Sequence, residues 1–297
     1  MLRVAPAPPG AGAQISALVH EAGRLVVRVG VDGVDSLRFI LDTAAESSAI
    51  TRAVADRLDI DASRVRRMRV VGVAGTRIMT SVALRSLSVG GARIAGVRAI
   101  VLDDGALGAG AFDGLLGNDV LRRYDVEIDV PGGALRLHAP ASLQASADRS
   151  ALIALPMKPG RDGFVAFDAT LGGAPVHAIL DTGTPVSLLN WRAAALAGVT
   201  PETSGVREGR GGTAGLDGVR ATTHEYRFDG LAFGSARFPP GRLRIADLPL
   251  FRVAGVALEP AMLVGVDLLR GCAAILAYST RTLHVCARPA ERSDQSS

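Results

Sequence analysis

Two aspartates stand where carboxylate chemistry is expected. Asp42 follows the apolar run 39–41, Asp181 follows the apolar run 178–180, and each is followed by threonine. A carboxylate at the end of a buried strand, with a turn of small residues after it, is held rigidly at a groove. Two carboxylates brought close together cannot both ionise easily, so such a pair shares one proton and can activate a water molecule.

The second reason to single out these aspartates is that their surroundings are duplicated. A lone Asp-Thr-Gly triplet is a weak signal, because all three are ordinary turn residues. Here residues 25–43 match residues 164–182, so the aspartates lie 139 residues apart at equivalent places. Each copy predicts a strand, a two-residue turn at Asp32-Gly33 or Gly172-Gly173, and a returning strand that ends on Asp-Thr.

Two further matches extend the repeat in the same order. Residues 86–93 resemble 230–237, and residues 115–121 resemble 263–269. Matched landmarks in one order indicate a duplicated lobe. Two such lobes related by a pseudo-twofold axis would place their equivalent carboxylates opposite each other.

The elements that must hold these residues are predicted to be short strands. The chain of 297 residues is 48% hydrophobic but only 4% aromatic, and its apolar runs are short and separated by Gly, Asp and Pro. This composition favours an all-β fold with a few short helices. We expect lobes at 15–140 and 151–288, with the boundary in the Ala/Ser/Pro-rich stretch 139–150. Short helices are predicted at 51–58, 118–124, 191–197 and 266–270.

The charge pattern offers no sign of a nucleic-acid partner. The net charge is +4, and its basic and acidic residues are interleaved. The densest basic stretch, 64–69, lacks interleaved aromatics and is interpreted as a solvated face. No apolar run approaches the roughly 18 to 20 residues that span a bilayer. No complete signal peptide is visible at the start.

Metal and cofactor chemistry have no visible motif. The five His are scattered, and no two have the spacing of metal ligands. No Gly-x-Ser-x-Gly or phosphate-binding loop is present. We therefore expect neither a metal nor a cofactor.

The two cysteines leave two interpretations open. Cys272 and Cys286 flank a predicted hairpin that turns near 279–280, and opposed positions on a hairpin can form a disulfide. A disulfide would favour an extracytoplasmic, periplasmic or secreted, location. Two independent buried thiols are an equal alternative, because free Cys often serves as a small core hydrophobe.

The paired motifs resemble a known family. Both copies combine an Asp-Thr segment with a later pair of apolar residues and a glycine, as in the signature of retropepsins and pepsins. In the first copy these residues are Asp42 and Thr43 with Leu115, Leu116 and Gly117. In the second copy they are Asp181, Thr182 and Gly183 with Leu263, Val264 and Gly265. The resemblance covers roughly 25–285 and is nearer to a fused retropepsin dimer than to a digestive pepsin. It implies two acid-protease β-barrel lobes, a catalytic dyad of the two aspartates, and ψ-shaped loops completed by the later motifs.

The same resemblance implies roles for further residues. Thr43 and Thr182 would exchange hydrogen bonds across the lobe interface, although a local turn hydroxyl is an open alternative for each. A flap that closes over an extended peptide is expected from two glycine-rich segments, namely Gly72, Val73, Ala74, Gly75 and Thr76 in the first lobe, and Gly211, Gly212 and Thr213 in the second. The second segment is equally compatible with an ordinary exposed loop.

The first lobe departs from the family at Ala44, where Gly is usual. The added methyl is either tolerated by a small backbone shift or displaces Asp42. The expected function is an aspartic endopeptidase that acts on extended peptides as a monomer, with its two lobes forming an internal pseudo-dimer. Two alternatives remain: a weak or inactive relative that binds extended peptides, and a structural pair of β-barrels that neither binds nor cuts.

Overall fold

The architecture was obtained from a computed structural model. The structure describes residues 13–72, 75–108, 110–143, 152–159, 163–209, 213–214, 220–271 and 273–286. Strands predominate and helices are short, so the chain has the all-β fold that the sequence predicts.

The first half contains the strands β1 (Gln14–Glu21), β2 (Arg24–Val31), β3 (Val34–Leu41), β4 (Ala49–Thr51), β5 (Val65–Gly72), β6 (Gly75–Ala83), β7 (Leu87–Val89), β8 (Ala92–Ile94), β9 (Arg98–Leu102), β10 (Gly114–Leu116), β11 (Asp125–Asp129) and β12 (Ala134–His138). The second half contains β13 (Leu152–Pro156), β14 (Lys158–Pro159), β15 (Val165–Leu171), β16 (Ala174–Leu180), β17 (Leu188–Leu189), β18 (Arg207–Glu208), β19 (Thr213–Ala214), β20 (Arg220–Ala221), β21 (His224–Phe228), β22 (Ala232–Phe233), β23 (Ala236–Arg237), β24 (Gly241–Ile245), β25 (Ala261–Val264), β26 (Ala273–Ala277) and β27 (Thr282–Cys286). The helices are α1 (Arg52–Arg57), α2 (Asn118–Leu121), α3 (Trp191–Leu196) and α4 (Pro249–Val253), with 3-10 turns at Ala62–Arg64 and Val266–Leu268.

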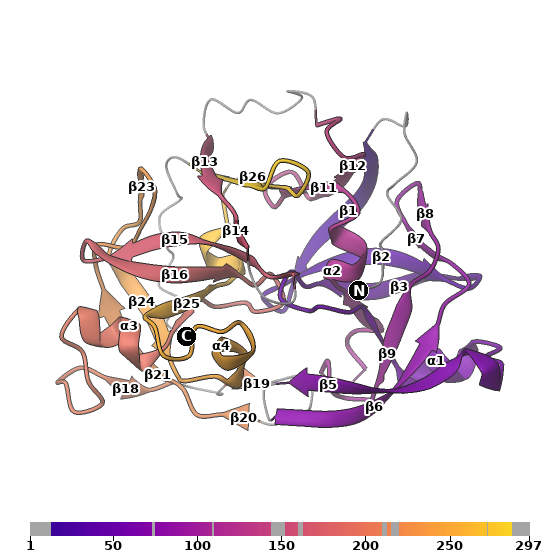
Figure 1. The fold of residues 1–297 in the computed structure, drawn as a ribbon, viewed down its shortest axis with the longest axis horizontal. Helices are drawn as coiled ribbons and strands as arrows, with labels where there is room; N and C mark the ends of the chain where they lie inside the picture. The colour runs from indigo at the N-terminus through magenta and orange to yellow at the C-terminus, as the bar shows by residue number, and fades with distance from the viewer. Residues whose placement is uncertain are drawn as a thin grey trace.

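Two homologous lobes lie side by side and share one sheet (Figure 1). The sheet of the first lobe continues through β12, β11, β26 and β27 to β13, so its strands come from both halves of the chain. In Figure 1 this shared part lies at the top, above the indigo-to-purple lobe on the right and the pink-to-orange lobe on the left. The antiparallel pairing of β11 with β26 joins the two halves.

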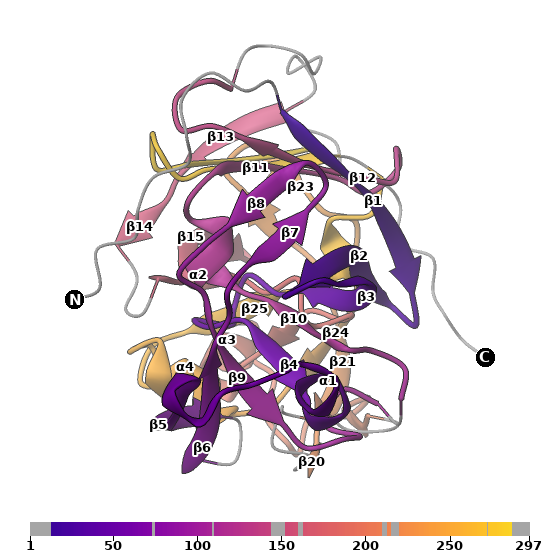
Figure 2. The same ribbon diagram turned by 90° about the vertical axis from the view of Figure 1, so that its right-hand side faces the viewer.

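Two further hairpins lie at the end of the molecule opposite the shared sheet, as the views in Figures 1 and 2 agree. One is β5–β6 of the first lobe, and the other is the small two-stranded sheet β19–β20 of the second. Strand β5 contacts helix α4, so the first hairpin reaches across to the second lobe.

Alternating burial explains why the strands that lead to the aspartates form. In β2 the apolar residues at alternate positions are buried and Arg28 is exposed, as expected for a strand with one face on a core. The turn after β2 has positive φ at Asp32 (48°) and Gly33 (89°), and the matching turn has positive φ at Gly172 and Gly173. Both are the two-residue hairpins predicted from Asp-Gly and Gly-Gly.

The helix predictions were partly right. Helices α1, α2 and α3 begin within one residue of the predicted starts, although α2 ends at Leu121 instead of Tyr124. The predicted helix 266–270 is a single 3-10 turn, and α4 was not predicted. Helix α4 begins with Pro249, whose fixed φ and missing N–H suit the first turn of a helix.

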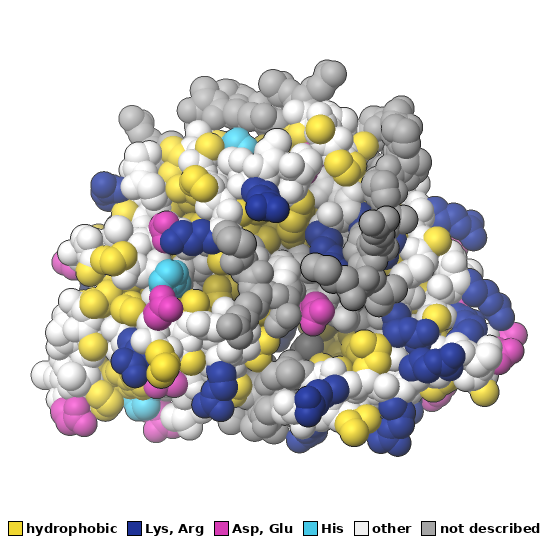
Figure 3. Space-filling model, in the orientation of Figure 1, with side chains coloured by type: hydrophobic (Ala, Val, Ile, Leu, Met, Phe, Trp, Pro, Cys, Tyr) yellow, Lys and Arg dark blue, Asp and Glu magenta, His cyan; other side chains and the backbone are white. Residues whose placement is uncertain are grey.

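The structure describes three further features that the sequence singled out. None of the helices in the described part of the chain is long and apolar enough to cross a membrane. Cys286 is disulfide-bonded, whereas Cys272 lies outside the described residues. Arg66, Arg67 and Arg69 are exposed on β5. Figure 3 shows basic side chains in dark blue over the lower right of one face, where Figure 1 places β5 and β6.

Candidate active site

Each aspartate follows a strand that is locked in place by a parallel partner. Strand β3 leads to Asp42 and pairs in parallel with β10, while β16 leads to Asp181 and pairs in parallel with β25. The amide of Asp42 donates to the Leu116 carbonyl at 3.0 Å, and the amide of Asp181 donates to the Val264 carbonyl at 2.9 Å. The two apolar pairs named from the sequence therefore hold the start of each Asp-Thr loop.

The glycine after each apolar pair permits the loop and the strand to touch. A Cβ on Gly117 would lie 2.8 Å from the backbone carbon of Ser47, and a Cβ on Gly265 would lie 2.8 Å from that of Val186. Real Cβ atoms do not approach this closely, so glycine is required at both places for its small size.

In each lobe, a serine and an aspartate hold the motif glycine against the Asp-Thr loop through hydrogen bonds. Ser48 donates its amide and its hydroxyl to Asp119 Oδ1, at 2.8 and 2.7 Å, and its hydroxyl accepts the Gly117 amide. Ser187 and Asp267 repeat the arrangement with Gly265, at 2.9 and 2.6 Å. Burial raises the pKa of Asp119, opposed by the hydrogen bonds from Ser48.

The two threonines cross-link the lobes. The Thr43 amide donates to Thr182 Oγ1 and the Thr182 amide to Thr43 Oγ1, both at 3.1 Å. Each hydroxyl then donates to a carbonyl of the opposite lobe, Thr43 to Leu180 and Thr182 to Leu41, both at 2.8 Å. Both threonines are fully buried. Because each hydroxyl is both donor and acceptor, the four bonds fix the two loops against each other.

The carboxyls of Asp42 and Asp181 are almost buried, at 9% and 8% exposure. Asp42 Oδ1 accepts the amides of Ala44 and Ala45, at 2.9 and 3.0 Å. Asp181 Oδ1 accepts the amide of Gly183 at 3.0 Å. A Cβ on Gly183 would lie 2.5 Å from Asp42 Cγ, so the second loop presses against the carboxyl of the first.

The two carboxyls interact electrostatically. Burial raises the pKa of Asp181 to about 8, and the neighbouring charge of Asp42 adds to the rise. Burial also raises the pKa of Asp42, against the opposing hydrogen bonds from Ala44 and Ala45. The charge of Arg24 lowers both pKa values. A pair of this kind holds one proton over a broad pH range, and its titration belongs to the pair.

Ala44 occupies the place that Gly183 occupies in the other loop. Its amide still donates to Asp42 Oδ1, as the Gly183 amide does to Asp181. Its side chain packs on an apolar cluster of the second lobe that includes Phe164 and Leu263. The methyl thus contacts the opposite lobe while the local hydrogen bond is kept.

Asn118 ties the first loop to the second half of the chain. Its side chain is fully buried, and Nδ2 donates to the Thr43 carbonyl at 2.6 Å. Its Oδ1 accepts the Tyr278 hydroxyl at 2.8 Å. Burial raises the pKa of Tyr278 above its usual value, so the hydroxyl remains a donor. In the repeat the position of Asn118 is taken by Val266, so this link exists once.

Apolar side chains gather beside both loops. In the first lobe, Ile40 and Leu115 belong to a cluster on which Met68 and Met79 of the β5–β6 hairpin pack. In the second lobe the equivalent Ile179 and Leu263 belong to the cluster that contacts Ala44. These two clusters are separate from the main core, which runs through both lobes.

The expected flap residues are described only in part. The first segment forms the end of β5–β6, where Gly72 pairs with Gly75, while Val73 and Ala74 lie outside the described residues. In the second segment, Thr213 begins β19, and Gly211 and Gly212 lie outside the described residues.

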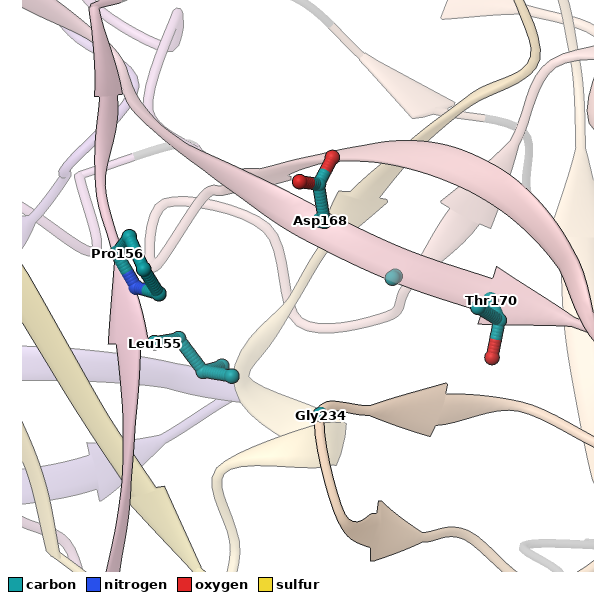
Figure 4. Close-up of a pocket in the computed structure, with 6 residues that line it drawn as sticks. Leu155, Pro156, Asp168, Thr170 and Gly234 are labelled. Atoms are coloured by element: carbon teal, nitrogen blue, oxygen red, sulfur yellow. The ribbon is translucent and has the colours of Figure 1, made fainter.

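One pocket lies apart from the aspartates. It has a volume of about 270 Å³ and is lined by Leu155, Pro156, Asp168, Ala169, Thr170 and Gly234. Figure 4 shows these residues on strands of the second half and the turn at Gly234. Within the described residues, no cluster of three or more His, Cys, Asp or Glu has a metal-binding arrangement.

Sequence reasoning missed several residues of the loop scaffold. Ser48 and Ser187 stand at equal distances after their aspartates, and Asp119 and Asp267 each follow the motif glycine by two residues. The repeat therefore contained a signal for both pairs. No signal in the repeat marks Arg24, because its repeat partner is Gly163.

The comparison with protein families agrees with the duplicated repeat. The family described as aspartyl protease matches two stretches of the chain, residues 27–120 and 167–268. A solved structure of a retropepsin-like aspartic protease from Rickettsia conorii is 24% identical, covers 42% of this chain and 89% of that chain, and has a TM-score of 0.31. Among curated proteins there is no significant match. Since the family matches both copies of the repeat and more than half of the chain, this protein belongs to the aspartyl protease family.

Proposed function

We propose that the protein is an aspartic endopeptidase in which Asp42 and Asp181 form the catalytic dyad. The observation that supports this most strongly is the pairing of two nearly buried carboxyls whose loops are cross-linked by Thr43 and Thr182. Such a pair retains one proton, because burial and mutual repulsion oppose full ionisation. Rigid loops keep the reacting groups in place, which is where much of the rate enhancement of such a site originates.

The reaction follows from one ionised and one protonated carboxyl. The ionised member removes a proton from a water molecule, whose oxygen bonds to the carbonyl carbon of the peptide. The protonated member donates to the carbonyl oxygen, and a gem-diol results. The C–N bond then breaks as the newly protonated carboxyl gives its proton to the leaving nitrogen, while a hydroxyl of the gem-diol returns a proton to the other carboxylate, so that the pair again holds one proton.

The substrate is proposed to be a peptide in extended conformation. Main-chain hydrogen bonds hold such a peptide, and its alternate side chains enter pockets. The apolar clusters beside the two loops, with Met68 and Met79 on the hairpin above the first, favour apolar side chains next to the scissile bond.

A relative that binds peptides without cutting them is the second candidate, and Ala44 is the observation that favours it. An extra methyl beside the dyad can displace a carboxyl, and errors near 1 Å cost about a hundredfold in rate. The retained hydrogen bond between the Ala44 amide and Asp42 supports the enzyme over this candidate.

The decisive experiment is cleavage of a mixed peptide library from about pH 3 to pH 8, a range that spans the expected titration of the pair. Wild type is compared with Asp42→Asn and Asp181→Asn, and with Asp229→Asn as a control because Asp229 is exposed. The proposal predicts cleavage by wild type and by the control, and loss of cleavage in both dyad variants.

Other outcomes discriminate between the candidates. Cleavage that survives both dyad substitutions would refute the dyad. Binding of extended peptides without cleavage by any variant, with folding verified by circular dichroism, would favour the peptide-binding relative. Neither binding nor cleavage would leave only the structural role.

A further inference from the structure

The β1–β2 hairpin of the first lobe rests on the second Asp-Thr loop. Ala22 and Gly23 form its turn with φ of 49° and 79°. A Cβ on Gly23 would lie 2.7 Å from Cβ of Pro185, so the backbone of the turn is in direct contact with the loop that contains Asp181. Glycine satisfies both the left-handed conformation and the close approach.

Arg24 follows this turn and extends the contact to the dyad loop. Its Nη1 donates to the Gly183 carbonyl at 2.7 Å, across 159 residues of sequence. The side of Gly183 that would carry a Cβ faces the Asp42 carboxyl. The guanidinium, the Gly183 peptide and the Asp42 carboxyl therefore form one continuous series of contacts. A hydrogen bond from a charged donor is stronger than one between neutral groups.

The two copies of the repeat differ at the position of this arginine. The repeat places Gly163 where the first lobe has Arg24. The Gly163 carbonyl accepts a hydrogen bond from Asn118 Nδ2 at 3.2 Å, and the guanidinium beside Gly163 is that of Arg122, whose Nη1 would lie 3.4 Å from a Cβ built there. The second loop is thus held by a cation that the first lobe supplies from the start of β2.

We infer that Arg24 is a positioning residue for the dyad, which fixes the Gly183 peptide against Asp42 and holds a positive charge beside both carboxyls. This inference rests on the proposed function and adds a residue to it. Arg24 is half-buried, so its charge is screened less than that of an exposed arginine.

The charged groups around this contact are few in the described part of the chain. Asp42 and Asp181 each sense the charge of Arg24, and Asp181 also senses that of Asp42. On the hairpin, Glu21 is paired with Arg38. His20 has its pKa lowered by burial first and then by the charge of Arg270.

The sign of the effect on pH dependence follows from the charge. A cation favours the ionised form of a carboxyl and lowers its pKa. Loss of the cation raises both pKa values, so both limbs of the activity profile move to higher pH. On the acid limb, kcat/KM should fall about three- to tenfold at a fixed pH, since one pKa unit corresponds to a tenfold change in ionised fraction.

The test compares three substitutions in the full chain. Arg24→Gln removes the charge, with Arg24→Met as a second neutral variant if the first does not fold, and Arg24→Lys keeps the charge without the planar fork. Arg28→Gln is the matched control, because Arg28 lies on the same strand, is exposed and donates to the Ser36 carbonyl of its own hairpin. Two readouts are taken: titration of 13C-labelled aspartate carboxyls by NMR, and kcat/KM against pH for a peptide that wild type cleaves.

We expect Arg24→Gln to move the carboxyl titration and both limbs to higher pH, and Arg24→Lys to keep their position while lowering kcat more than it changes KM. Arg28→Gln should match wild type. An unchanged titration in the neutral variants would overturn the inference, as would a pH-independent loss of activity with a lower melting temperature. If wild type cleaves no peptide, the proposed function fails, and the NMR titration still decides the role of Arg24.

Discussion

The two Asp-Thr loops share one scaffold but differ in what surrounds them. Both have a parallel strand at their start, a tightly packed glycine, a serine bonded to an aspartate, and reciprocal threonine bonds of equal length. Three of the paired positions at which they differ are Ala44 against Gly183, Asn118 against Val266, and Arg24 against Gly163. The duplicated contacts fix the backbone, and the unique contacts touch the carboxyls or the outside of the loops.

The two carboxyls are nevertheless expected to titrate unequally. Both accept backbone amides, which favour the charged form: Asp42 accepts those of Ala44 and Ala45, and Asp181 accepts those of Gly183 and Thr184. Burial and the charge of Asp42 together raise the pKa of Asp181 to about 8. The shared proton is therefore expected on Asp181, with Asp42 as the ionised carboxyl.

The largest effect is expected when the second loop receives the alanine of the first. In Gly183→Ala the new methyl would lie 2.5 Å from Asp42 Cγ. The carboxyl must then move, and we expect kcat/KM to fall about a hundredfold, equivalent to about 2.7 kcal/mol. The measurement is steady-state kinetics on the peptide found in the library. A folded variant with activity within about threefold of wild type would show that the loop tolerates alanine on either side.

The two threonines should contribute equally to the free energy of unfolding, because their hydrogen bonds are equivalent. Thr43→Val and Thr182→Val each leave a buried amide and a buried carbonyl of the other lobe without a partner. We expect each to lower the free energy of unfolding by about 2 to 3 kcal/mol. Urea denaturation measures this, with the exposed Thr222→Val as the control. A difference above about 1 kcal/mol between the two variants would contradict their equivalence.

The link at Asn118 should matter in one lobe only. Asn118→Val copies the second lobe and removes the bonds to the Thr43 carbonyl, the Gly163 carbonyl and the Tyr278 hydroxyl, so we expect a loss of about 2 to 3 kcal/mol of stability. Tyr278→Phe removes only the second bond and should cost about 1 kcal/mol. Thermal unfolding of both variants measures these losses. Equal stabilities for wild type and Asn118→Val would show that the Asn118 link does not stabilise the first lobe.

The raised pKa of Asp181 predicts a pH dependence of stability. Between the ordinary pKa of an aspartate and about 8, the folded protein holds a proton at Asp181 that the unfolded chain has lost. Stability therefore falls as pH rises through this range. Asp181→Asn should reduce the fall, because Asp42 also has a raised pKa, and should melt about 3 °C or more above wild type near pH 8, with the difference vanishing near pH 4. The Asp229→Asn control should follow wild type, and a constant difference at all pH values would argue against a raised pKa.

The smallest effect is expected for Ala44→Gly. Ala44 keeps its hydrogen bond to Asp42, and its methyl already packs on the second lobe. Its removal should change kcat/KM by less than about threefold, below 1 kcal/mol. An increase of tenfold or more in the same peptide assay would identify the methyl as the cause of a weakened site.

The repeat made much of the scaffold predictable. The two hairpins, the Asp-Thr loops and the motif glycines are local patterns that occur twice, so each copy supported the other. Helix α4 was missed because its apolar sequence, Pro249–Val253, is also typical of a strand and only its first residue marks a helix start.

The unique contacts of the site could not be found in this way. The bond from Arg24 to Gly183 spans 159 residues, and that from Tyr278 to Asn118 spans 160. No spacing in a sequence pairs residues that meet only through the packing of two lobes. The substitution of Asn118 for Val266 within a repeated motif was a visible signal of one such contact, because a buried amide requires partners.

The shared sheet has a consequence for how the chain reaches its native state. Strand β11 obtains its second neighbour only when β26 arrives, and Val126 pairs with Leu276 near the other end of the chain. Pairings between such distant segments slow folding, since a large loop must close before the contact forms. During synthesis the first lobe emerges with the open edge of β11 exposed, and an open edge readily pairs with another chain. Strands β26 and β27, the last that the described part of the chain contains, therefore also protect the protein from aggregation.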